Sequence, residues 1–387
     1  MVKAIKVMLI PNNVQKTKMF QYAGASRFAY NWALAREIEN YEKGGKFISD
    51  AELRKEFTKL RHSDEYAWLL SISNNVTKQA IKDACTAYKN FFKGLQKFPR
   101  FKSKKRSMPK FYQDNVKIRF SNTHVKFEGF SSSRKANKQK MNWVRLAEHG
   151  SIPTDAKYMN PRISFDGLNW WISVCVEFPD CRETLNDDGV GIDLGIKDLA
   201  ICSDGTKYKN INKSQKVKKL EKQKRRLQRS ISRSYEKNKK GESYCKTNNV
   251  IKKEKLLLKR NHRLTNIRKN YLNQTISEII NRKPRFICIE DLNVSGMMKN
   301  RHLSKAVQEQ GFFWFRKQLE YKCSDKGIQL IVADRFYPSS KLCSCCGNIK
   351  KDLKLSDRVY RCACGNMIDR DFQASINLKT YGEKFAS

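Results

Sequence analysis

Cysteines cluster near the carboxyl end of this 387-residue chain in a pattern that could bind a metal. Five of the 12 cysteines fall between residues 343 and 364. Two short pairs stand out, each followed by a glycine, and they are Cys343 with Cys346 and Cys362 with Cys364. Four thiolates close a tetrahedral structural zinc site, and the glycines permit a tight turn after each pair. The spacing therefore predicts a zinc ribbon, with Cys345 as a competitor for the place of Cys343.

Three carboxylates in the second half of the chain stand beside apolar runs. Asp193 lies within the run 190–195, Glu290 directly follows the run 286–289, and Asp371 precedes the last predicted helix. An acid in such a place is costly unless something compensates for its charge. Each acid alone could be a hydrogen-bonded cap or turn. Together they predict a site of hard oxygen ligands for two Mg²⁺ ions about 4 Å apart, which would hydrolyse a phosphodiester.

The region after residue 188 is predicted to be α/β, with buried strands that end at these acids. Gly191 and Gly195 flank Asp193, and we interpret them as space for a metal and a phosphate to approach the strand end. The predicted elements, in chain order, are strands at 190–194 and 199–202, two helices over 213–280 that break near 240, a strand at 286–289, a helix over 303–322, a strand at 328–333 and a helix from 372.

The first half combines strands with a helical block. Residues 3–10 alternate in polarity, and residues 112–178 do so on both sides of the turn signal Asp166-Gly167, so both segments are predicted to be strands. Between residues 15 and 95 the apolar spacing is helical. We expect a small antiparallel sheet or barrel that the helical block interrupts.

The composition indicates a polyanionic partner. There are 79 Lys and Arg residues against 38 Asp and Glu, a formal charge of +41, and a compact chain with that charge repels itself. Aromatic residues occur throughout the chain, which excludes a histone-like tail. No uncharged stretch approaches 18 residues, which excludes a membrane protein, and the apolar run 7–10 is too short for a signal peptide. We therefore expect an intracellular protein that binds nucleic acid.

Two segments carry much of the positive charge. Residues 96–140 contain 14 basic and 2 acidic residues, and residues 213–263 contain 20 basic and 4 acidic residues. A charge run by itself is usually a solvated face. Aromatic side chains such as Phe98 and Phe101 interleave with the cations here, which favours contact with a phosphate backbone and stacking on bases. The five histidines form no second nuclease motif, so we expect one nuclease centre.

Several motifs together resemble the TnpB family of transposon-encoded proteins, and miniature type V CRISPR nucleases share the pattern. The motifs look like the split RuvC nuclease and zinc ribbon of that family, and the resemblance covers nearly the whole chain. Its one departure is the second cysteine pair, which is shorter by one residue. The matching segments are residues 27–32, 98–102, 191–197, 289–292, 337–343 and 369–377.

The resemblance implies an RNA-guided DNA endonuclease. A guide RNA would pair with target double-stranded DNA beside a short adjacent motif, and opened single strands, including the displaced one, would pass to the acids. By the same resemblance Asp193, Glu290 and Asp371 are the catalytic ligands of Mg²⁺. Asp371 is preferred to Asp369, because the acid of the family directly follows Arg370. The four paired cysteines would hold structural Zn²⁺.

The implied fold is an α/β multidomain arrangement. A wedge β-barrel would comprise residues 1–13 and 106–185, and a helical recognition domain at 14–105 would interrupt it. Residues 186–387 would form an RNase H-like RuvC nuclease domain, with a zinc ribbon inserted at 340–366. We expect a monomeric protein in its ribonucleoprotein, located in the prokaryotic cytoplasm or nucleoid.

Contacts with nucleic acid are assigned to the helical block and the basic segment after it. The helical block would read the adjacent motif, although a solvated helix face is an open alternative. The predicted contact residues are Asn75, Lys78, Gln79, Arg100, Lys102, Lys104 and Lys105. Two other functions also stay open, namely an RNA-guided repressor that does not cut and a guide-free nuclease of the Holliday-junction type.

Overall fold

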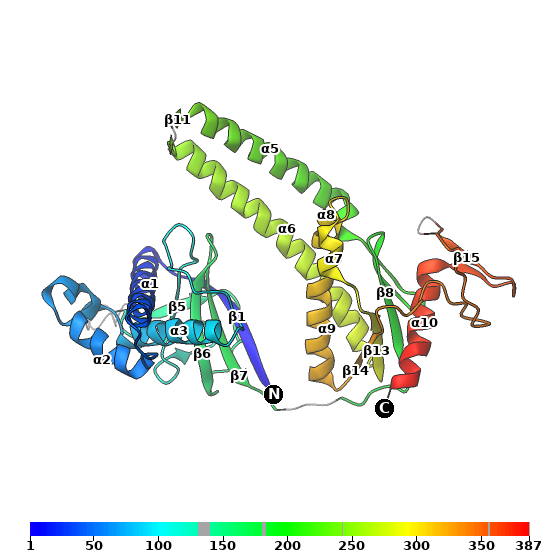
Figure 1. Cartoon of the computed structure of the whole chain (residues 1–387), viewed down its shortest axis with the longest axis horizontal. Helices are drawn as coiled ribbons and strands as arrows, with labels where there is room; N and C mark the ends of the chain where they lie inside the picture. Colours follow the sequence, from blue (N-terminus) through cyan, green and yellow to red (C-terminus); the bar gives the residue numbers. More distant parts are fainter. Residues whose placement is uncertain (131–139, 180–182, 242, 355–356, 387) are drawn as a thin grey trace. The chain divides into compact units, whose positions relative to one another are not determined.

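The computed structural model describes residues 1–130, 140–179, 183–241, 243–354 and 357–386. The chain divides into two compact units, Met1–Pro179 and Asp180–Ser387, and each combines helices with sheets (Figure 1). Small parts of the predicted basic segments, wedge domain, zinc ribbon and nuclease domain lie outside the described residues. Within the described residues, no helix is both long enough and apolar enough to span a membrane.

Seven antiparallel strands form the sheet of the first unit. They are β1 (Val2–Ile10), β2 (Lys110–Tyr112), β3 (Arg119–Phe120), β4 (His124–Lys126), β5 (Trp143–Leu146), β6 (Tyr158–Phe165) and β7 (Trp170–Glu177). Their order is β2-β6-β7-β1-β5-β4-β3. The predicted hairpin is confirmed, because β6 pairs with β7 across Gly167, whose φ is +95°. The antiparallel sheet is confirmed too, but pairing among the described residues is open at β2 and β3, so the expected closed barrel is not found there.

Helices cover this sheet, as the apolar spacing predicted. They are α1 (Asn13–Glu42), α2 (Asp50–Arg61), the 3₁₀ helix η1 (Asp64–Ser71) and α3 (Asn74–Phe92). Asn12 and Gln15 form a capping box that starts α1 directly after β1. Tyr22 and Leu34 of α1 and Trp170 of β7 belong to one continuous core, so helices and sheet form a single packed unit.

Five strands form the main sheet of the second unit. They are β8 (Val190–Leu194), β9 (Asp198–Cys202), β10 (Lys207–Lys209), β13 (Phe286–Glu290) and β14 (Gln329–Ala333). Their order is β10-β9-β8-β13-β14. β8, β9 and β10 pair antiparallel, whereas β8, β13 and β14 run parallel. The carboxyl ends of the three parallel strands therefore meet at one edge of the sheet.

The second unit also contains helices, some of which cover its sheet. They are α5 (Gln215–Lys237), α6 (Asn248–Asn281), α7 (Val294–Lys299), α8 (Ser304–Gln310), α9 (Phe312–Lys326) and α10 (Arg370–Phe385), and the 3₁₀ helix η2 (Ile211–Lys213) precedes α5. α9 and the carboxyl half of α6 pack on one face, and α10 packs on the other (Figure 1).

Two predictions about these helices had different outcomes. The predicted break near residue 240 is confirmed, because a short hairpin of β11 (Lys239–Lys240) and β12 (Ser243–Tyr244) separates α5 from α6. The single helix predicted over 303–322 is wrong. Gly311 takes a left-handed conformation with a φ of +71° and divides it into α8 and α9. Glycine adopts this conformation at little cost, and the apolar spacing continues across it.

Candidate active site

Strand alternation places two of the three predicted acids on the same face of the second sheet. Cys288 of β13 lies opposite Gly191 of β8, and Ile289 lies opposite Ile192 in the same parallel register. Asp193 therefore follows Gly191 by two residues on one face, and Glu290 follows Cys288 in the same way. That face is the one that α10 covers, so both acids project toward the side of the helix.

Close contact between backbones brings α10 onto the strands. A Cβ atom on Gly191 would lie 2.0 Å from the carbonyl oxygen of Ser375 and 2.3 Å from the amide nitrogen of Lys379, both in α10. Gly382 approaches the partner strand equally closely, because its Cβ would lie 2.3 Å from the ring of Phe286. Gly191 thus makes room for a helix, and our interpretation of it as space for a metal or phosphate is wrong.

The amino-terminal turn of α10 supplies the third acid. Asp371 lies one turn before Ser375 and so faces the same strands. Asp369 caps the helix, since its Oδ1 accepts hydrogen bonds from the backbone N–H groups of Asp371 and Phe372, each at 3.1 Å. The capping role agrees with the choice of Asp371 over Asp369. We call Asp193, Glu290 and Asp371 the acidic edge.

Burial, together with mutual repulsion, disfavours the charged forms of two members of the acidic edge. Burial raises the pKa of Asp193 well above its usual range, and the charges of Glu290 and Asp371 raise it further. Burial also raises the pKa of Glu290, although a hydrogen bond from Ser339 and the charge of Arg370 oppose that rise. Arg370 and Arg358, which lies 3.9 Å from Asp371, offset this only in part, and a bound cation would stabilise the charged forms of Asp193 and Glu290.

The ligand atoms of the acidic edge are less tightly grouped than those of the cysteine cluster. Among the described residues, only the cysteines bring ligand atoms of three or more side chains within 4.8 Å of one another. The three carboxylates therefore do not converge on one point. A site for two ions about 4 Å apart would share the three acids between the ions.

Residues that the sequence analysis did not assign hold the acidic edge in place. The hydroxyl of Ser339 donates a hydrogen bond to Oε1 of Glu290. The amide of Asn377 in α10 donates to the carbonyl oxygens of Ser339 and Leu342, each at 2.7 Å, and so fixes the segment that carries this hydroxyl. Ser339 belongs to the matched motif 337–343, but nothing in the spacing showed its partner.

The four paired cysteines lie at distances that suit zinc. Sγ of Cys343 is 3.7 Å from Sγ of Cys364, and Sγ of Cys346 is 3.6 Å from Sγ of Cys362. Four sulfurs about 2.3 Å from a zinc ion would be about 3.8 Å apart. The exposed Cys345 is not part of the cluster. The donor set therefore fits a closed structural site.

Short hairpins form the cysteine turns. β15 (Val359–Arg361) and β16 (Met367–Asp369) pair on either side of the second cysteine pair, and β16 leads directly into α10. Gly347 and Gly365 follow the two cysteine pairs with φ values of +73° and +88°. The predicted need for glycine at both turns is thus confirmed, because these angles are strained for other residues.

Cys343 is the buried member of the cluster and the one tied to α10. Although burial raises its pKa, hydrogen bonds from the backbone of Cys346, the side chain of Asn366 and the backbone of Cys345 lower it to about 6. The thiolate that this favours is the form that binds metals. Asn366 also donates to Oε1 of Gln373 in α10 at 2.9 Å. The ribbon and the acidic edge are therefore built on the same helix.

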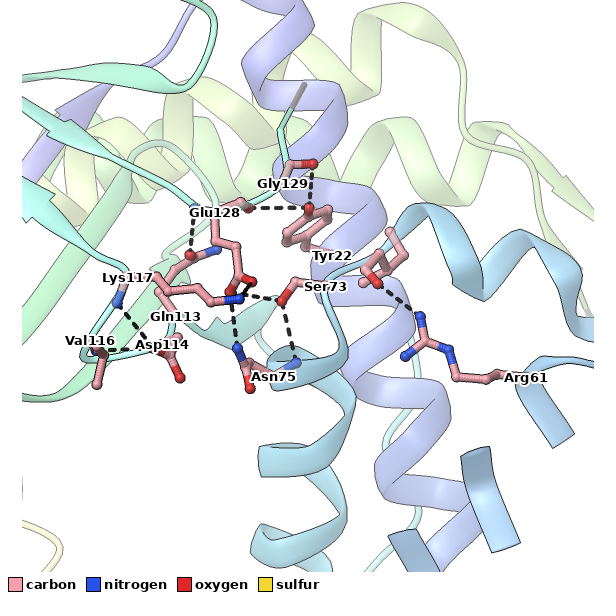
Figure 2. A network of polar contacts seen from close by, with 11 residues as sticks. Tyr22, Arg61, Ser73, Asn75, Gln113, Asp114, Val116, Lys117, Glu128 and Gly129 are labelled. Atoms are coloured by element: carbon pink, nitrogen blue, oxygen red, sulfur yellow. Dashed lines mark hydrogen bonds and ion pairs between the residues drawn. The ribbon is translucent and has the colours of Figure 1, made fainter. Parts of the chain in front are cut away.

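In the first unit, a polar network surrounds one of the predicted contact residues (Figure 2). Glu128, which follows β4, accepts hydrogen bonds from the hydroxyl of Ser73 at 3.0 Å and the amide of Asn75 at 3.1 Å. Nζ of Lys117 lies 2.5 Å from its other oxygen. The side-chain amide of Asn75 thus donates to Glu128, which leaves its side-chain carbonyl oxygen as the group that could accept a hydrogen bond from nucleic acid.

The other predicted contacts in this unit differ in accessibility. The amide of Gln79 donates to Asp83 at 2.9 Å, whereas Lys78 is exposed. Arg100 is exposed too. Lys104 and Lys105 line a cavity of 770 Å³ together with the apolar side chains of Phe20, Met108 and Phe165.

Lys102 is held by its own unit. Its Nζ lies 3.0 Å from the centre of the Tyr30 ring, and its backbone exchanges two hydrogen bonds with the side chain of Asn31. Burial and, to a lesser extent, the charge of Lys110 lower its pKa to about 7. A phosphate would have to compete with these contacts, so Lys102 is the least supported of the seven predicted contact residues.

The second unit carries cations along α5. A cavity of 620 Å³ beside this helix is lined by two acids, Glu221 and Glu309, and by five basic side chains of α5, which are Lys218, Lys222, Arg225, Arg226 and Arg229. Val217 and Leu220 pack against Leu264 of α6 and leave these cations on the outer side. The helix pair thus presents the basic segment as a row of positive charge.

Three family models match parts of the chain. The model described as "Probable transposase" matches residues 173–301, the "Cas12f1-like, TNB domain" matches residues 312–378, and a "Helix-turn-helix domain" matches residues 1–46. The last description does not fit the structure, because residues 1–46 form β1 and the single long helix α1.

Relatives match over nearly the full length. InsQ of Escherichia coli (strain K12), named as a candidate RNA-guided DNA endonuclease, is 30% identical and covers 93% of this chain and 87% of its own length. A protein of Streptomyces pristinaespiralis with the same description is 28% identical and covers 98% of this chain and 89% of its own length. The solved structure of a Cas12f1–sgRNA–target DNA complex has a TM-score of 0.60 at 11% identity, with 98% of both chains covered. That likeness shows the fold alone.

Proposed function

The chain belongs to the TnpB family of RNA-guided DNA endonucleases, and from this membership and the acidic edge we propose that it cuts DNA under the direction of a guide RNA. The guide RNA pairs with target DNA beside a short adjacent motif, so base pairing rather than the protein reads the sequence. A single site then hydrolyses the phosphodiester. The placement of Asp193, Glu290 and Asp371, from three elements, at one edge of the sheet is the observation that carries the proposal.

The finer fold assignment belongs to the same proposal. The order β10-β9-β8-β13-β14, with three antiparallel and then two parallel strands, supports an RNase H-like RuvC domain over residues 186–387. Residues 14–105 are the recognition domain, and residues 1–13 and 106–185 are the wedge domain. The protein acts as a monomer in its ribonucleoprotein and works in the prokaryotic cytoplasm.

The acidic edge suits Mg²⁺, because its donors are carboxylate oxygens whose charges the described chain leaves largely uncompensated. When bound, the metal ions supply an activated water and stabilise the leaving oxygen. Asp193, Glu290 and Asp371 hold the ions, and Ser339 orients one oxygen of Glu290. The four paired cysteines hold Zn²⁺, which keeps the ribbon folded against α10.

Positive surfaces hold the nucleic acid. The exposed cations of α5 and α6 contact the phosphates of the guide RNA and of its duplex with the target. In the first unit, Asn75, Lys78 and Gln79 read the adjacent motif, and the basic segment with Arg100, Lys104 and Lys105 contacts the backbone. Lys78, Arg100, Lys104 and Lys105 are exposed, which supports their part of this assignment.

The test begins with RNA that copurifies with the protein when it is expressed with its native flanking sequence. We expect one discrete species with a variable end, and random fragments would contradict a guide. The reconstituted complex should then cut a plasmid library that carries the matching target only beside one short motif. Cutting by the protein without RNA would instead support a guide-free nuclease.

The Asp193→Ala variant separates cutting from binding. It should bind guide RNA and target DNA as the wild type does and should not cut. If it cuts at the wild-type rate, the acidic edge is not the active site. A wild-type complex that binds the target tightly and never cuts would support a repressor.

A further inference from the structure

A phenylalanine beside the acidic edge is left almost entirely in solvent. Phe336 lies in the loop after β14 and is 87% exposed, the highest value among the large hydrophobic side chains of the described residues. Single exposed apolar residues are common on proteins, so the exposure alone assigns nothing. The exposure of Phe336 is informative because contacts fix the loop on both sides of this residue.

The side of the loop before Phe336 is attached to the strand that carries an acid of the site. Arg335 contacts one oxygen of Asp291 through Nε at 3.0 Å and through Nη2 at 2.5 Å. Asp291 is the chain neighbour of Glu290, and Arg316 of α9 contacts its other oxygen at 2.7 Å. The residue before Phe336 is therefore fixed at the acidic edge.

The backbone of Phe336 and the side of the loop after it are fixed as well. The N–H of Phe336 donates to Oδ1 of Asp334 at 2.8 Å, which makes a tight turn. The hydroxyl of Tyr337 donates to the carbonyl oxygen of Asn377 in α10 at 3.1 Å. Ser339 then contacts Glu290. Ser339 is three positions after Phe336, so their Cα atoms are at most about 11 Å apart.

The surroundings indicate what could cover the Phe336 ring. Arg335, which is paired with Asp291, and Lys341 are exposed cations on the two sides of Phe336, Asp334 is an exposed acid beside Arg335, and the chain as a whole carries a formal charge of +41. Such surroundings suit a phosphate backbone better than an apolar protein surface. A base inside a duplex has both faces stacked, whereas an unpaired base has a face free for an aromatic ring.

We propose that Phe336 is a stacking platform for an unpaired nucleobase of the DNA strand that is cut. The inference rests on the proposed function and adds a subsite for single-stranded nucleic acid. Stacking would hold the strand a few nucleotides from the acidic edge, and the paired Arg335 would keep the platform rigid. Phe336 thereby acts as a positioning residue, because it touches the substrate strand but not the reacting phosphodiester.

The experiment uses the full chain with its guide RNA. Phe336→Ala should weaken binding of a short single-stranded DNA about tenfold and raise KM for its cleavage by a similar factor, with kcat less affected. Phe336→Trp should restore both values, because tryptophan keeps a flat ring. Phe336→Leu should not, because leucine keeps apolar area without a stacking face. A 2-aminopurine placed in the bound strand should be quenched by the wild type and by Phe336→Trp only.

Phe385→Ala is the matched control. Phe385 is 58% exposed and lies at the end of α10, beside Gln329 and therefore at the opposite edge of the sheet. It should change neither affinity nor cleavage. Equal affinity of Phe336→Ala and wild type, or full rescue by leucine, would overturn the stacking role. The affinity and quenching measurements need no cutting, so failure of the proposed nuclease activity would be seen separately, in the wild type.

Discussion

Both units contain carboxylates withdrawn from solvent, but the chain treats them in opposite ways. In the first unit, Asp83 accepts two hydrogen bonds from Arg162, at 2.6 and 2.9 Å, and a third from Gln79. Burial alone would raise the pKa of Asp83, yet these donors lower it below its usual value. Glu128 behaves in the same way with its own three donors.

The acidic edge of the second unit has weaker compensation, namely the charge of Arg370 and an ion pair of 3.9 Å between Arg358 and Asp371. Ser339 donates to Glu290, but within the described residues no hydrogen-bond donor contacts Asp193. Burial and mutual repulsion raise the pKa of both acids. The comparison shows that an acid with its own donors stabilises a fold, whereas acids brought together without donors require a ligand. That difference, rather than burial itself, marks the second group as functional.

The largest expected effect separates the two groups by activity. Asp193→Asn should reduce the rate of guided cleavage about 1,000-fold or more, because it removes a ligand charge from the metal site. Asp83→Asn, the matched change in the first unit, should cleave within about tenfold of the wild type at a temperature where it is folded. Single-turnover cleavage with saturating guide RNA measures both. Equal losses of cleavage rate in the two variants would show that the acids of the two units do not differ in function.

Zinc removal tests whether the acidic edge depends on the ribbon. Cys346→Ala should lose the single zinc per chain, measured by atomic emission, and should cut about 10- to 100-fold more slowly, because the segment that carries Ser339 leads directly into the ribbon. Cys345→Ala is the control and should keep both zinc and activity. A zinc-free variant that cuts normally would show that the acidic edge needs no ribbon.

Stability should respond in opposite directions to the same chemical change. Without divalent ions, Asp193→Asn should leave the second unit as stable as before or more stable, because it relieves repulsion. Asp83→Asn should destabilise the first unit by about 1–3 kcal/mol, since it leaves Arg162 without its charged partner. Thermal and urea unfolding of the two variants measure the difference. A loss of stability in Asp193→Asn would mean that this acid has a structural partner.

The smallest effect is a pH dependence of opposite sign. The pKa values of Asp193 and Glu290 are raised on folding, so the folded state binds more protons, and stability of the second unit should fall as pH rises from the ordinary carboxyl range through the raised values. For Asp83 and Glu128 the pKa values are lowered, so stability of the first unit should be lost as pH falls through them. Each proton contributes at most about 1.4 kcal/mol per pH unit.

Hydrogen exchange distinguishes these two pH dependences. Amides of β8 and β13 should be better protected in mild acid than at neutral pH after correction for intrinsic rates, whereas amides of α3 should lose protection only when the pH falls below the ordinary carboxyl range. Added Mg²⁺ should remove the loss of protection at neutral pH in β8 and β13 only. The same sign of change in both units would contradict the comparison.

Local patterns in the sequence determined the parts of this protein that depend on local energetics. Polarity of period two predicted β1, β6 and β7, apolar spacing predicted the helical block, and the polar residues near 240 predicted the division of α5 from α6. Cysteine spacing predicted the ribbon, and apolar runs that end in acids singled out Asp193 and Glu290. These features arise from interactions between residues close in the chain.

Only the tertiary structure decided the rest, because it depends on contacts between residues far apart in the chain. The parallel register of β8 and β13 places Asp193 and Glu290 on one face, and a shift of one residue would separate them. Gly191 is explained by the backbone of α10, which no local pattern contains. The open sheet edge, the partner of Ser339 and the exposure of Phe336 likewise follow from which segments pack together. Residue types thus identified the acids, while the packing of distant strands and a helix determined their geometry and electrostatic environment.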